Sequence, residues 1–556
     1  MSATDAAAQP KGLALLRAAF SDRRTLAMLL LGFSAGLPFV LVTGTLNAWL
    51  SAAEVTASTI GVLSWVGLAY AFKFLWSPAM SSTLPIIGRL GRRRGWMVTL
   101  QVVIGIALFI VAASHPEAPG GVAAMAAAAA LAAFASATQD IVIDAWRIEV
   151  AGDRAPIDLL SSIYQFGYRI ASLAGAAGAL LVAAAIGWPG VYMIGGLLMG
   201  LGLLGTLIAP EPEPAPQQAV LKERRGSDRL RNLSLFAVLA GWAWAAYQII
   251  HFMVRALTET EPPSAGEFTG SMGPWIIAAA VILPCVLAAV ISRQATTEAA
   301  TGSGLLDTLY DRILAPLTEL MGRLKWAALL VLGLILSYRL TDSIWGSFAY
   351  PFYMGTEGGA LGHTLVEVAL ASKTFGVIVT IFGIALGGWM LLSLGRMATL
   401  TLGAILAAST NLLFADLANG APVIGGLMHA TGLYSLFGAF GVGEPMARLM
   451  LAITGENLAS GIAGTAFVAY LSALSSRMFG AVQFAIFTSL ALLIGTLGRA
   501  PLGEMIDQQG FAPVFVVAAW LGTIAIAFCI LEWIREARGR PLPADQATTA
   551  TEDAEA

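Results

Sequence analysis

Long runs of apolar residues, separated by short polar segments, recur along almost the whole 556-residue chain. An α-helix needs about 20 mainly apolar residues to cross the roughly 30 Å of hydrocarbon in a bilayer. About fourteen runs are long enough, near residues 26–50, 58–80, 96–114, 121–145, 158–186, 188–209, 233–256, 272–292, 326–349, 364–392, 397–417, 444–474, 482–505 and 511–533. The pattern predicts an all-α polytopic membrane protein.

The order of these runs predicts an internal repeat. Six spans fill residues 1–209 and six more fill residues 326–535. Between them, residues 210–325 contain Pro-rich and charge-rich linkers, which cannot cross lipid, and two further spans that form an inserted hairpin. Two six-helix bundles around a central cavity are typical of secondary transporters. We expect the remaining residues, 536–556, to be a disordered cytoplasmic tail.

Composition agrees with a membrane protein and excludes several other classes. Hydrophobic residues make up 57% of the chain and charged residues 12%, whereas soluble domains carry about 25% charged residues. No basic domain indicates a nucleic-acid partner. The two cysteines lie in apolar runs and the four histidines are scattered, so we predict neither a metal nor a cofactor. No phosphate-cradling GxxxxGK[ST] loop is present, and nucleotide hydrolysis is not expected.

Basic residues predict the orientation of the chain. They cluster in alternate loops, while the loops at 51–57, 115–120 and 187–190 contain no lysine or arginine. The positive-inside rule then puts both termini in the cytoplasm. A further apolar segment, 421–443, would invert everything after it if it crossed the membrane. We therefore interpret it as interfacial or re-entrant.

The segment SATQDIVIDAW (136–146) places two acids at the end of an apolar span. Asp140 and Asp144 are four residues apart, so they share one face of a helix. A carboxylate next to hydrocarbon is costly and usually functional. One interpretation is a gate, in which the acids pair with Arg147 or with the basic residues that precede the third span, Arg92, Arg93 and Arg94. The other is direct participation in proton or substrate transfer.

The second half carries charges at corresponding places. Lys73 and Lys373 each lie in the second span of their half, and Glu456 lies in the span that corresponds to that of Asp140. Arg339 and Asp342 are three residues apart and can pair along one helix face, which would give Arg339 a gating role. If that pair opens, Asp342 becomes a candidate proton site beside Glu456. Each lysine could bind an anionic substrate or neutralise an acid in the opposite half.

Arg169 is the leading candidate for substrate binding. Counting 1.5 Å per residue from the start of its span puts it close to the bilayer midplane, where a cation should face a cavity or a partner acid. A guanidinium can hold a carboxylate by two hydrogen bonds. The alternative is an internal ion pair with Asp140 or Glu456. Neighbouring Tyr168 shares its surroundings, and the amides of two further residues could bind sugar hydroxyls or join helices, namely Gln139 and Asn457.

Several motifs resemble those of the AmpG muropeptide permeases of the major facilitator superfamily. They occur in family order in both halves: GFSAGLPF (32–39), FKFLWSP (72–78), GRRRGW (91–96), SATQDIVIDAW (136–146), GYRI (167–170), YRLTDS (338–343), ASKTFG (371–376), ENLASGIAGTAFVAYLSALS (456–475) and AVQFAIFTSL (481–490). The resemblance implies the major facilitator fold. It also implies proton-coupled import of anhydromuropeptides across the inner membrane for peptidoglycan recycling, and a link to induction of β-lactamase. The expected partners are muropeptide, protons and the lipid bilayer, and we expect a monomer.

Two departures and two alternatives remain. The superfamily carries an acid before the basic cluster of its second loop, whereas this chain has Ser81 and Ser82 near that place. The segment 421–443 is an addition. The QDIxxDxW pattern also occurs in related acetyl-CoA transporters, which gives a second substrate hypothesis. A muropeptide sensor that transports nothing is the other, while an embedded enzyme lacks any nucleophile–base or metal constellation.

Overall fold

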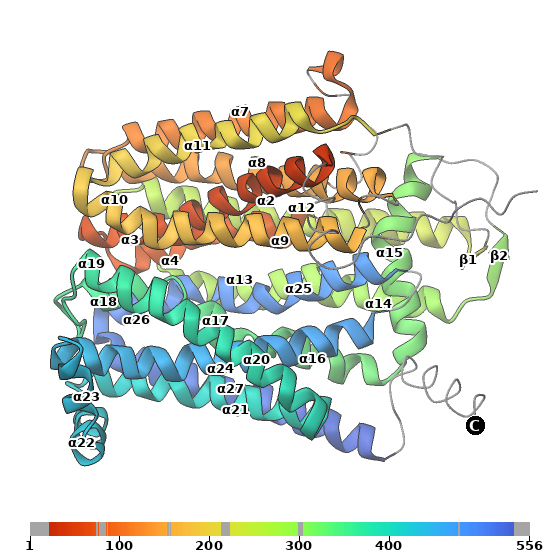
Figure 1. Ribbon diagram of the computed structural model, residues 1–556. Helices are drawn as coiled ribbons and strands as arrows, with labels where there is room; N and C mark the ends of the chain where they lie inside the picture. The colour runs from red at the N-terminus through yellow and green to blue at the C-terminus, as the bar shows by residue number, and fades with distance from the viewer. Residues whose placement is uncertain are drawn as a thin grey trace, which may run out of the picture. The chain divides into compact units, whose positions relative to one another are not determined.

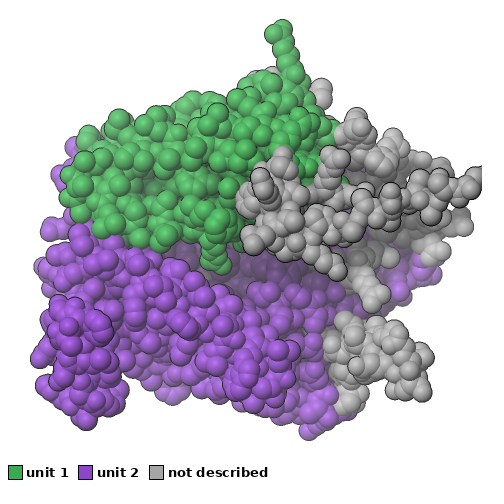
Figure 2. Space-filling model, viewed as in Figure 1, with its two compact units in different colours: residues 1–45, 79–115, 124–218 green, residues 46–78, 116–123, 219–556 purple. Residues whose placement is uncertain are grey.

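The computed structural model describes a chain of helices joined by short loops (Figure 1). The described residues are 22–73, 76, 80, 85, 87–152, 155, 157–212, 223–298, 304–475 and 479–538. They form two compact units, coloured separately in Figure 2. Unit 1 comprises residues 1–45, 79–115 and 124–218, and unit 2 comprises residues 46–78, 116–123 and 219–556. The residues of the predicted tail from 539 onward lie outside the described part.

Twelve of the fourteen predicted spans are confirmed. Among the described residues, twelve helices are long and apolar enough to cross a membrane. They are Arg23–Ala52, Arg92–Ala113, Gly121–Val150, Ile163–Ile186, Trp188–Ile208, Asp228–Thr258, Ala265–Ser292, Leu365–Leu394, Arg396–Ala418, Glu444–Leu474, Val482–Gln509 and Phe511–Ala537.

The other two predicted spans are shorter or broken. The second run gives an apolar helix over Ala57–Tyr70, and part of its remainder lies outside the described residues. The ninth run gives three short helices, α16 (Ala327–Tyr338), α17 (Leu340–Trp345) and α18 (Ala349–Met354). Helices interrupted in this way are typical of transporter binding sites, because they free backbone groups and side chains to face a cavity.

Unit 1 is built mainly from long apolar helices. Its α2 (Arg23–Val40) packs against α9 (Ile157–Leu173), and α7 (Arg92–Ala113) packs against α11 (Trp188–Ile208). The remaining elements that lie wholly or mainly in this unit are the π-helical η1 (Leu41–Thr45) and η5 (Ala174–Gly178), the 3-10 helix η4 (Gly88–Leu90), α8 (Gly121–Val150) and α10 (Ala179–Ile186).

Unit 2 contains the second set of helices, the inserted hairpin and the predicted second span. The first helix of the hairpin is α12 (Asp228–Thr258), and its second consists of α13 (Ala265–Ile277), η6 (Ala278–Ile282) and α14 (Leu283–Ser292). The other elements are α3 (Leu46–Ala52), α4 (Ala57–Leu63), η2 (Ser64–Gly67), α5 (Leu68–Phe72), α19 (Leu365–Val368), η7 (Ala369–Phe375), α20 (Gly376–Leu394), α21 (Arg396–Ala418), α24 (Glu444–Leu474), α25 (Gly480–Leu497), α26 (Arg499–Gln509) and α27 (Phe511–Ala537).

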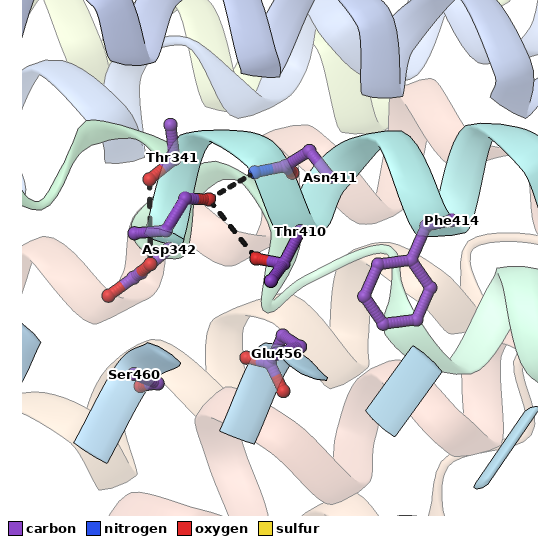
Figure 3. A pocket seen from close by; sticks show the side chains of 8 residues that line it. Thr341, Asp342, Thr410, Asn411, Phe414, Glu456 and Ser460 are labelled. Atoms are coloured by element: carbon purple, nitrogen blue, oxygen red, sulfur yellow. Dashed lines mark hydrogen bonds between the residues drawn. The ribbon is translucent and has the colours of Figure 1, made fainter. Parts of the chain in front are cut away.

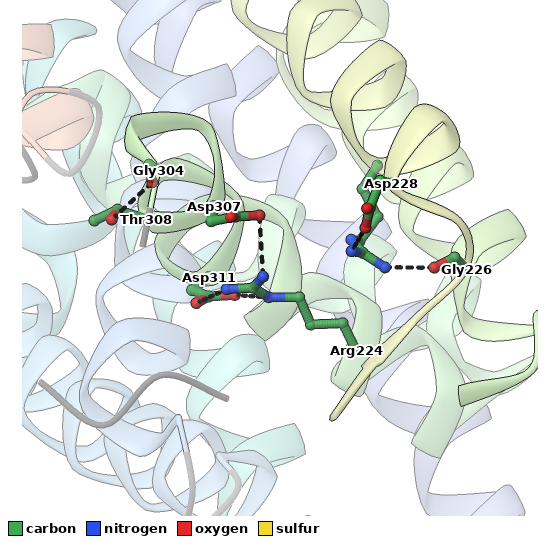
Figure 4. A network of polar contacts seen from close by, with 8 residues as sticks. Arg224, Gly226, Asp228, Gly304, Asp307, Thr308 and Asp311 are labelled. Atoms are coloured by element: carbon green, nitrogen blue, oxygen red, sulfur yellow. Dashed lines mark hydrogen bonds and ion pairs between the residues drawn. The ribbon is translucent and has the colours of Figure 1, made fainter. Parts of the chain in front are cut away.

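A polar network joins the two sides of the inserted hairpin (Figure 4). Strands β1 (Glu223–Arg225) and β2 (Thr296–Glu298) pair antiparallel, and Arg224 of β1 contacts both Asp307 and Asp311 of α15 (Leu305–Leu324) at 3.0 and 2.7 Å. The hydrogen bond to Asp311 raises the pKa of the Arg224 guanidinium. Two ion pairs therefore link helix α15 to the strand that precedes the hairpin.

The segment 421–443 folds as two short helices rather than one span. These are α22 (Pro422–Thr431) and α23 (Leu433–Ala439), with a left-handed turn at Gly432 between them (φ +71°). Asp416 accepts hydrogen bonds from the first amides of α22, those of Val423 and Ile424, at 3.0 and 2.8 Å. Figure 1 shows both helices beyond the ends of α21 and α24. This division agrees with the interfacial interpretation, since neither helix is long enough to cross a bilayer.

Candidate functional site

The break between α16 and α17 places an ion pair inside unit 2. Arg339 ends α16, and its Nε lies 3.2 Å from Oδ2 of Asp342 in the first turn of α17. The two side chains are 32% and 19% exposed, so the pair is accessible from one side. The pairing expected from the three-residue spacing is present.

Beside this pair lies a small polar cavity (Figure 3). Its volume of about 10 Å³ is enough for about one water molecule. Helices α17, α21 and α24 contribute the lining residues Thr341, Asp342, Ala407, Thr410, Asn411, Phe414, Glu456 and Ser460. The side chains of Thr410 and Asn411 both donate to the backbone carbonyl of Ala407. The charged side chains in the lining are the carboxylates of Asp342 and Glu456. The cavity suits a water or a proton, and it is too small for a sugar.

Glu456 is held by a short chain of hydrogen bonds between α24 and α20. The amide of Asn457 donates to Oε2 of Glu456 at 2.7 Å, and the hydroxyl of Thr380 donates to Oδ1 of Asn457 at 2.8 Å. Asn457 also donates to the carbonyl of Ile453 at 3.0 Å. The contacts of Asn457 described here are therefore internal, and they hold the neighbouring carboxylate in place.

Lys373 supplies a second cation to the same region. It lies in η7, a π-helical segment, and such segments occur often at functional sites. Its Nζ stands 4.8 Å from the ring centroid of Tyr350 on α18. Lys373, Arg339 and Asp342 all lie close enough to Glu456 to act on it electrostatically. The four ionised groups sum to zero charge.

Lys73, the sequence counterpart of Lys373, lies at the end of α5 in unit 2. It is half-buried. The two lysines differ in secondary structure. Lys373 lies within a π-helical segment, whereas Lys73 follows the last residue of a short α-helix. The sequence symmetry of the two lysines is thus not repeated in their local backbone.

In unit 1, Asp144 is engaged by its own helix. Its Oδ1 lies 3.0 Å from the guanidinium of Arg147, which also stands over the ring of Tyr164 at 5.2 Å. The ring of Tyr164 in turn lies 6.2 Å from that of Tyr168. The expected pairing with Arg147 is present, and it is continued by two aromatic rings on α9.

Asp140 and Gln139 are buried between helices of unit 1. Asp140 is 8% exposed and Gln139 is fully buried. The Gln139 amide donates to the carbonyl of Ser34 on α2 at 3.1 Å, which is a helix–helix contact. Its Oε1 has no partner among the described residues. The NH2 group of Gln139 therefore joins α8 to α2, while its carbonyl oxygen makes no hydrogen bond to the described residues.

Arg169 on α9 is exposed. Within the described ranges of the chain, no carboxylate lies within 4.0 Å of it, so the internal pair with Asp140 is not formed. An exposed guanidinium in an apolar span needs water or a ligand. The structure leaves Arg169 available for one.

Two acids that were not among the sequence candidates contact the start of α7. Arg93 contacts Glu149 at 2.5 Å and Arg92 contacts the same carboxylate at 3.7 Å, while Glu211 accepts from the backbone amides of Arg93 and Arg94 at 2.8 and 3.0 Å. Asp144 pairs with Arg147 instead of with these arginines. Ser81 and Ser82 lie outside the described residues.

Glu149 could have been found, because it follows Arg147 by two residues in a segment expected near the basic cluster. Glu211 and Tyr350 carry no comparable sequence signal. In the part of the chain that is described, no group of three or more His, Cys, Asp or Glu side chains could hold a metal ion.

Comparisons with known proteins now bear on the identity of this arrangement. A family model described as "Acetyl-coenzyme A transporter 1" matches residues 25–157. The anhydromuropeptide permease of Escherichia coli (strain K12) is 29% identical over 527 residues, which cover 93% of this chain and 82% of the relative. The resemblance to the AmpG-type permeases is confirmed. A putative transporter AmpG 4 of Rickettsia felis is 22% identical, with 92% of this chain and 97% of the relative covered.

Solved structures confirm the major facilitator fold. A POT family transporter in complex with 5-aminolevulinic acid covers 93% of this chain and 96% of its own length, with a TM-score of 0.56 and 13% identity. An auto-inhibited POT family peptide transporter covers 94% and 97%, with a TM-score of 0.57 and 12% identity. The chain therefore shares the all-α, multi-span membrane fold of these transporters.

Proposed function

We propose that the chain imports anhydromuropeptides across the bacterial inner membrane in symport with protons, with both termini in the cytoplasm. The observation that carries this proposal is the similarity to the E. coli anhydromuropeptide permease over 93% of the chain. The charge-balanced cluster of unit 2 supports the proton-coupled part of it. Import would feed peptidoglycan recycling and, through the cytoplasmic muropeptide pool, induction of β-lactamase.

The proton site in this proposal is Glu456, with Asp342 beside it. With all four groups ionised, Arg339 is paired with Asp342, and Glu456 balances the charge of Lys373. Protonation of Glu456 leaves one positive charge uncompensated, which attracts an anionic substrate. By linkage, a bound anion favours the protonated carboxyl to the same extent. Proton and substrate therefore promote each other's binding.

Lys373 of unit 2 and Arg169 of unit 1 are each proposed to bind a carboxylate of the substrate. Muropeptides carry peptide carboxylates, and both side chains can give charge-assisted hydrogen bonds to them. Tyr168 is proposed for polar contacts and the aromatic rings of α9 for sugar faces. Gln139 is fully buried, so its oxygen would reach the substrate only after α2 and α8 move apart. Lys73 remains a weaker candidate for the same role.

Gating is assigned to charges near helix ends. We propose that Asp144 with Arg147, and Arg339 with Asp342, are pairs that break and re-form during alternating access. Asp140 shares the face of Asp144 and is proposed to take part. The arginines 92–94 contribute by fastening α7 to α8 and α11 through Glu149, Glu211 and the last carbonyls of α11.

Uptake into proteoliposomes tests the proposal. Purified protein is reconstituted, a pH gradient is imposed with the outside acidic, and accumulation of labelled anhydromuropeptide is followed. We expect accumulation above the external concentration, abolished when an ionophore collapses the gradient. Uptake that equilibrates but ignores the gradient contradicts proton coupling, and binding without uptake supports the sensor.

A second candidate substrate is acetyl-CoA. The match of residues 25–157 to the acetyl-coenzyme A transporter family favours it. Its phosphates would suit the same cations. Labelled acetyl-CoA in the same vesicles distinguishes the two, because the proposal expects it neither to accumulate nor to compete with muropeptide.

A further inference from the structure

Helices α4 and α26 approach each other backbone to backbone. A methyl group at Gly61 of α4 would lie 2.8 Å from the carbonyl oxygen of Arg499 and 2.9 Å from the Cα of Ala500. A methyl group at Gly503 of α26 would meet the backbone of Ala57 and Ser58 in the same way. Such contacts form only where no Cβ intervenes. We call this contact, residues 57–61 against 499–507, the α4–α26 seam.

An acid closes one end of the seam. The carboxylate of Asp507 accepts hydrogen bonds from the backbone amides of Ala57 and Ser58, both at 2.9 Å. These amides begin α4 and have no partner within the helix. A negative charge there is also favoured by the helix dipole. The seam is therefore held by close packing along its length and by charge at its end.

The inserted hairpin is attached to the same turn of α26. Glu504, three residues before Asp507, accepts from the backbone amides of Ala265 and Gly266 and from the hydroxyl of Ser264, the last two at 2.8 and 3.0 Å. Those groups form the start of α13. One turn of α26 thus binds the first amides of two helices, one from the first repeat of the sequence and one from the insertion.

The hairpin also contacts the other side of the seam. Trp65, which continues from α4 in η2, is 2% exposed and lies 5.5 Å from the ring of Phe252 on α12 and 5.9 Å from that of Phe268 on α13. The two phenylalanine rings stack at 4.2 Å. Residues of α4, η2, both hairpin helices and α26 belong to one buried apolar cluster. The hairpin therefore touches both partners of the seam.

We propose that the inserted hairpin is a brace that holds the α4–α26 seam closed and so stabilises the state of the transporter in which this end is shut. The proposed orientation puts this end outside the cell. The inference rests on the proposed transport function in one respect, which is that a helix of the first repeat and a helix of the second must separate here during each cycle. Without the brace the seam opens more often.

Thiol labelling measures seam opening directly. Ala57 is 7% exposed in the seam, so A57C reports its opening through the rate of reaction with a water-soluble maleimide. The two native cysteines, Cys285 and Cys529, are buried and are replaced by alanine. Labelling is done on purified protein without substrate or gradient, so the result does not depend on which molecule is transported.

Two substitutions detach the brace and one is a matched control. E504Q weakens the bonds to α13, and F268L removes the ring that contacts Trp65. Charge-assisted hydrogen bonds contribute enough for about a tenfold change in such an equilibrium, so we expect labelling to rise by about that factor in E504Q and several-fold in F268L. The control is E259Q. Glu259 lies between α12 and α13 and pairs with the exposed Arg255, so this variant should label like the parent protein.

Two further variants keep the outcome decisive. D507N and G503A act on the seam itself and should also raise labelling, while unchanged melting temperatures show that each variant is folded. If D507N opens the seam but E504Q and F268L label as slowly as E259Q, the hairpin is no brace. If none of the four changes the rate, the seam does not open and the proposal is wrong. Loss of muropeptide uptake in the separate vesicle assay has no bearing on either result.

Discussion

Two ion pairs with the same spacing show how differently one local pattern can be used. In each pair the two residues are three positions apart. The guanidinium nitrogen lies 3.0 Å from the carboxylate oxygen in the pair of Asp144 with Arg147 of unit 1, and 3.2 Å from it in the pair of Arg339 with Asp342 of unit 2. The first extends to aromatic rings and its carboxylate is 41% exposed. The second has a further carboxylate and a lysine within electrostatic reach, beside a water-sized cavity. In our proposal only the second arrangement takes up a proton and an anion together, so that its net charge does not change.

The largest effect is expected for Glu456. E456Q mimics the protonated side chain permanently, so proton uptake and release no longer accompany each cycle. We expect gradient-driven accumulation of muropeptide in proteoliposomes to be lost, while exchange of labelled for unlabelled substrate continues. This result would separate the coupling step from the binding step.

The matched control is E444Q at the exposed start of the same helix, where Glu444 pairs with Arg448 at 3.2 Å. It should accumulate muropeptide like the unmodified protein. Loss of accumulation in both variants, or normal accumulation in E456Q, would contradict the assignment of the proton to unit 2.

Lys373 is expected to have the next largest effect. K373Q keeps a polar side chain but removes the charge that the protonated cluster offers to an anion. A hydrogen bond to a charged group contributes about 1.5–3 kcal/mol, so muropeptide affinity should fall roughly 10- to 100-fold. Isothermal titration with purified protein measures this, and an unchanged dissociation constant would remove Lys373 from the binding site.

Arg169 should have a smaller effect, since it acts in unit 1 and is exposed to solvent. We expect R169Q to weaken muropeptide binding about tenfold without altering its dependence on pH, because a solvated guanidinium loses part of its contribution to screening. Titration at two pH values separates the two properties. A changed pH dependence would mean that both units share the proton site.

The smallest effect is expected for Asp144. D144N breaks a partly exposed pair, which is typically worth 0.2–1 kcal/mol, and Arg147 keeps its contact with Tyr164. Uptake rate should change less than about twofold. Initial rates in vesicles check this, and a loss comparable to that of E456Q would make the two ion pairs functionally equal and contradict the comparison.

The sequence predicted most of the fold because the lipid requirement is one-dimensional. A span must be apolar over its length, and twelve runs met that condition and formed helices. The ninth run forms three short helices, α16, α17 and α18, and a hydropathy average does not show where a helix is interrupted. Two three-residue strands beside the hairpin had no signal, since they depend on pairing between segments about 70 residues apart.

The candidate site was only partly predictable, for a related reason. Spacing along a helix predicted both ion pairs. It gave no account of Glu149, which binds Arg92 and Arg93 from another helix, or of Tyr350, which contacts Lys373 from α18. Nor did it show that Asn457 would be bonded to its neighbour Glu456. Contacts between helices depend on their rotation and depth, which the pattern of apolar residues leaves open.

The dependence of muropeptide affinity on pH, in purified protein without any gradient, tests the central claim most directly. Between about pH 9 and pH 5 we predict that the dissociation constant of the unmodified protein falls roughly tenfold or more, because the proton and the anion promote each other's binding. In E456Q the affinity should be high and independent of pH. An affinity that is flat in the unmodified protein, or that retains the same slope in E456Q, would contradict the coupling of substrate and proton through Glu456.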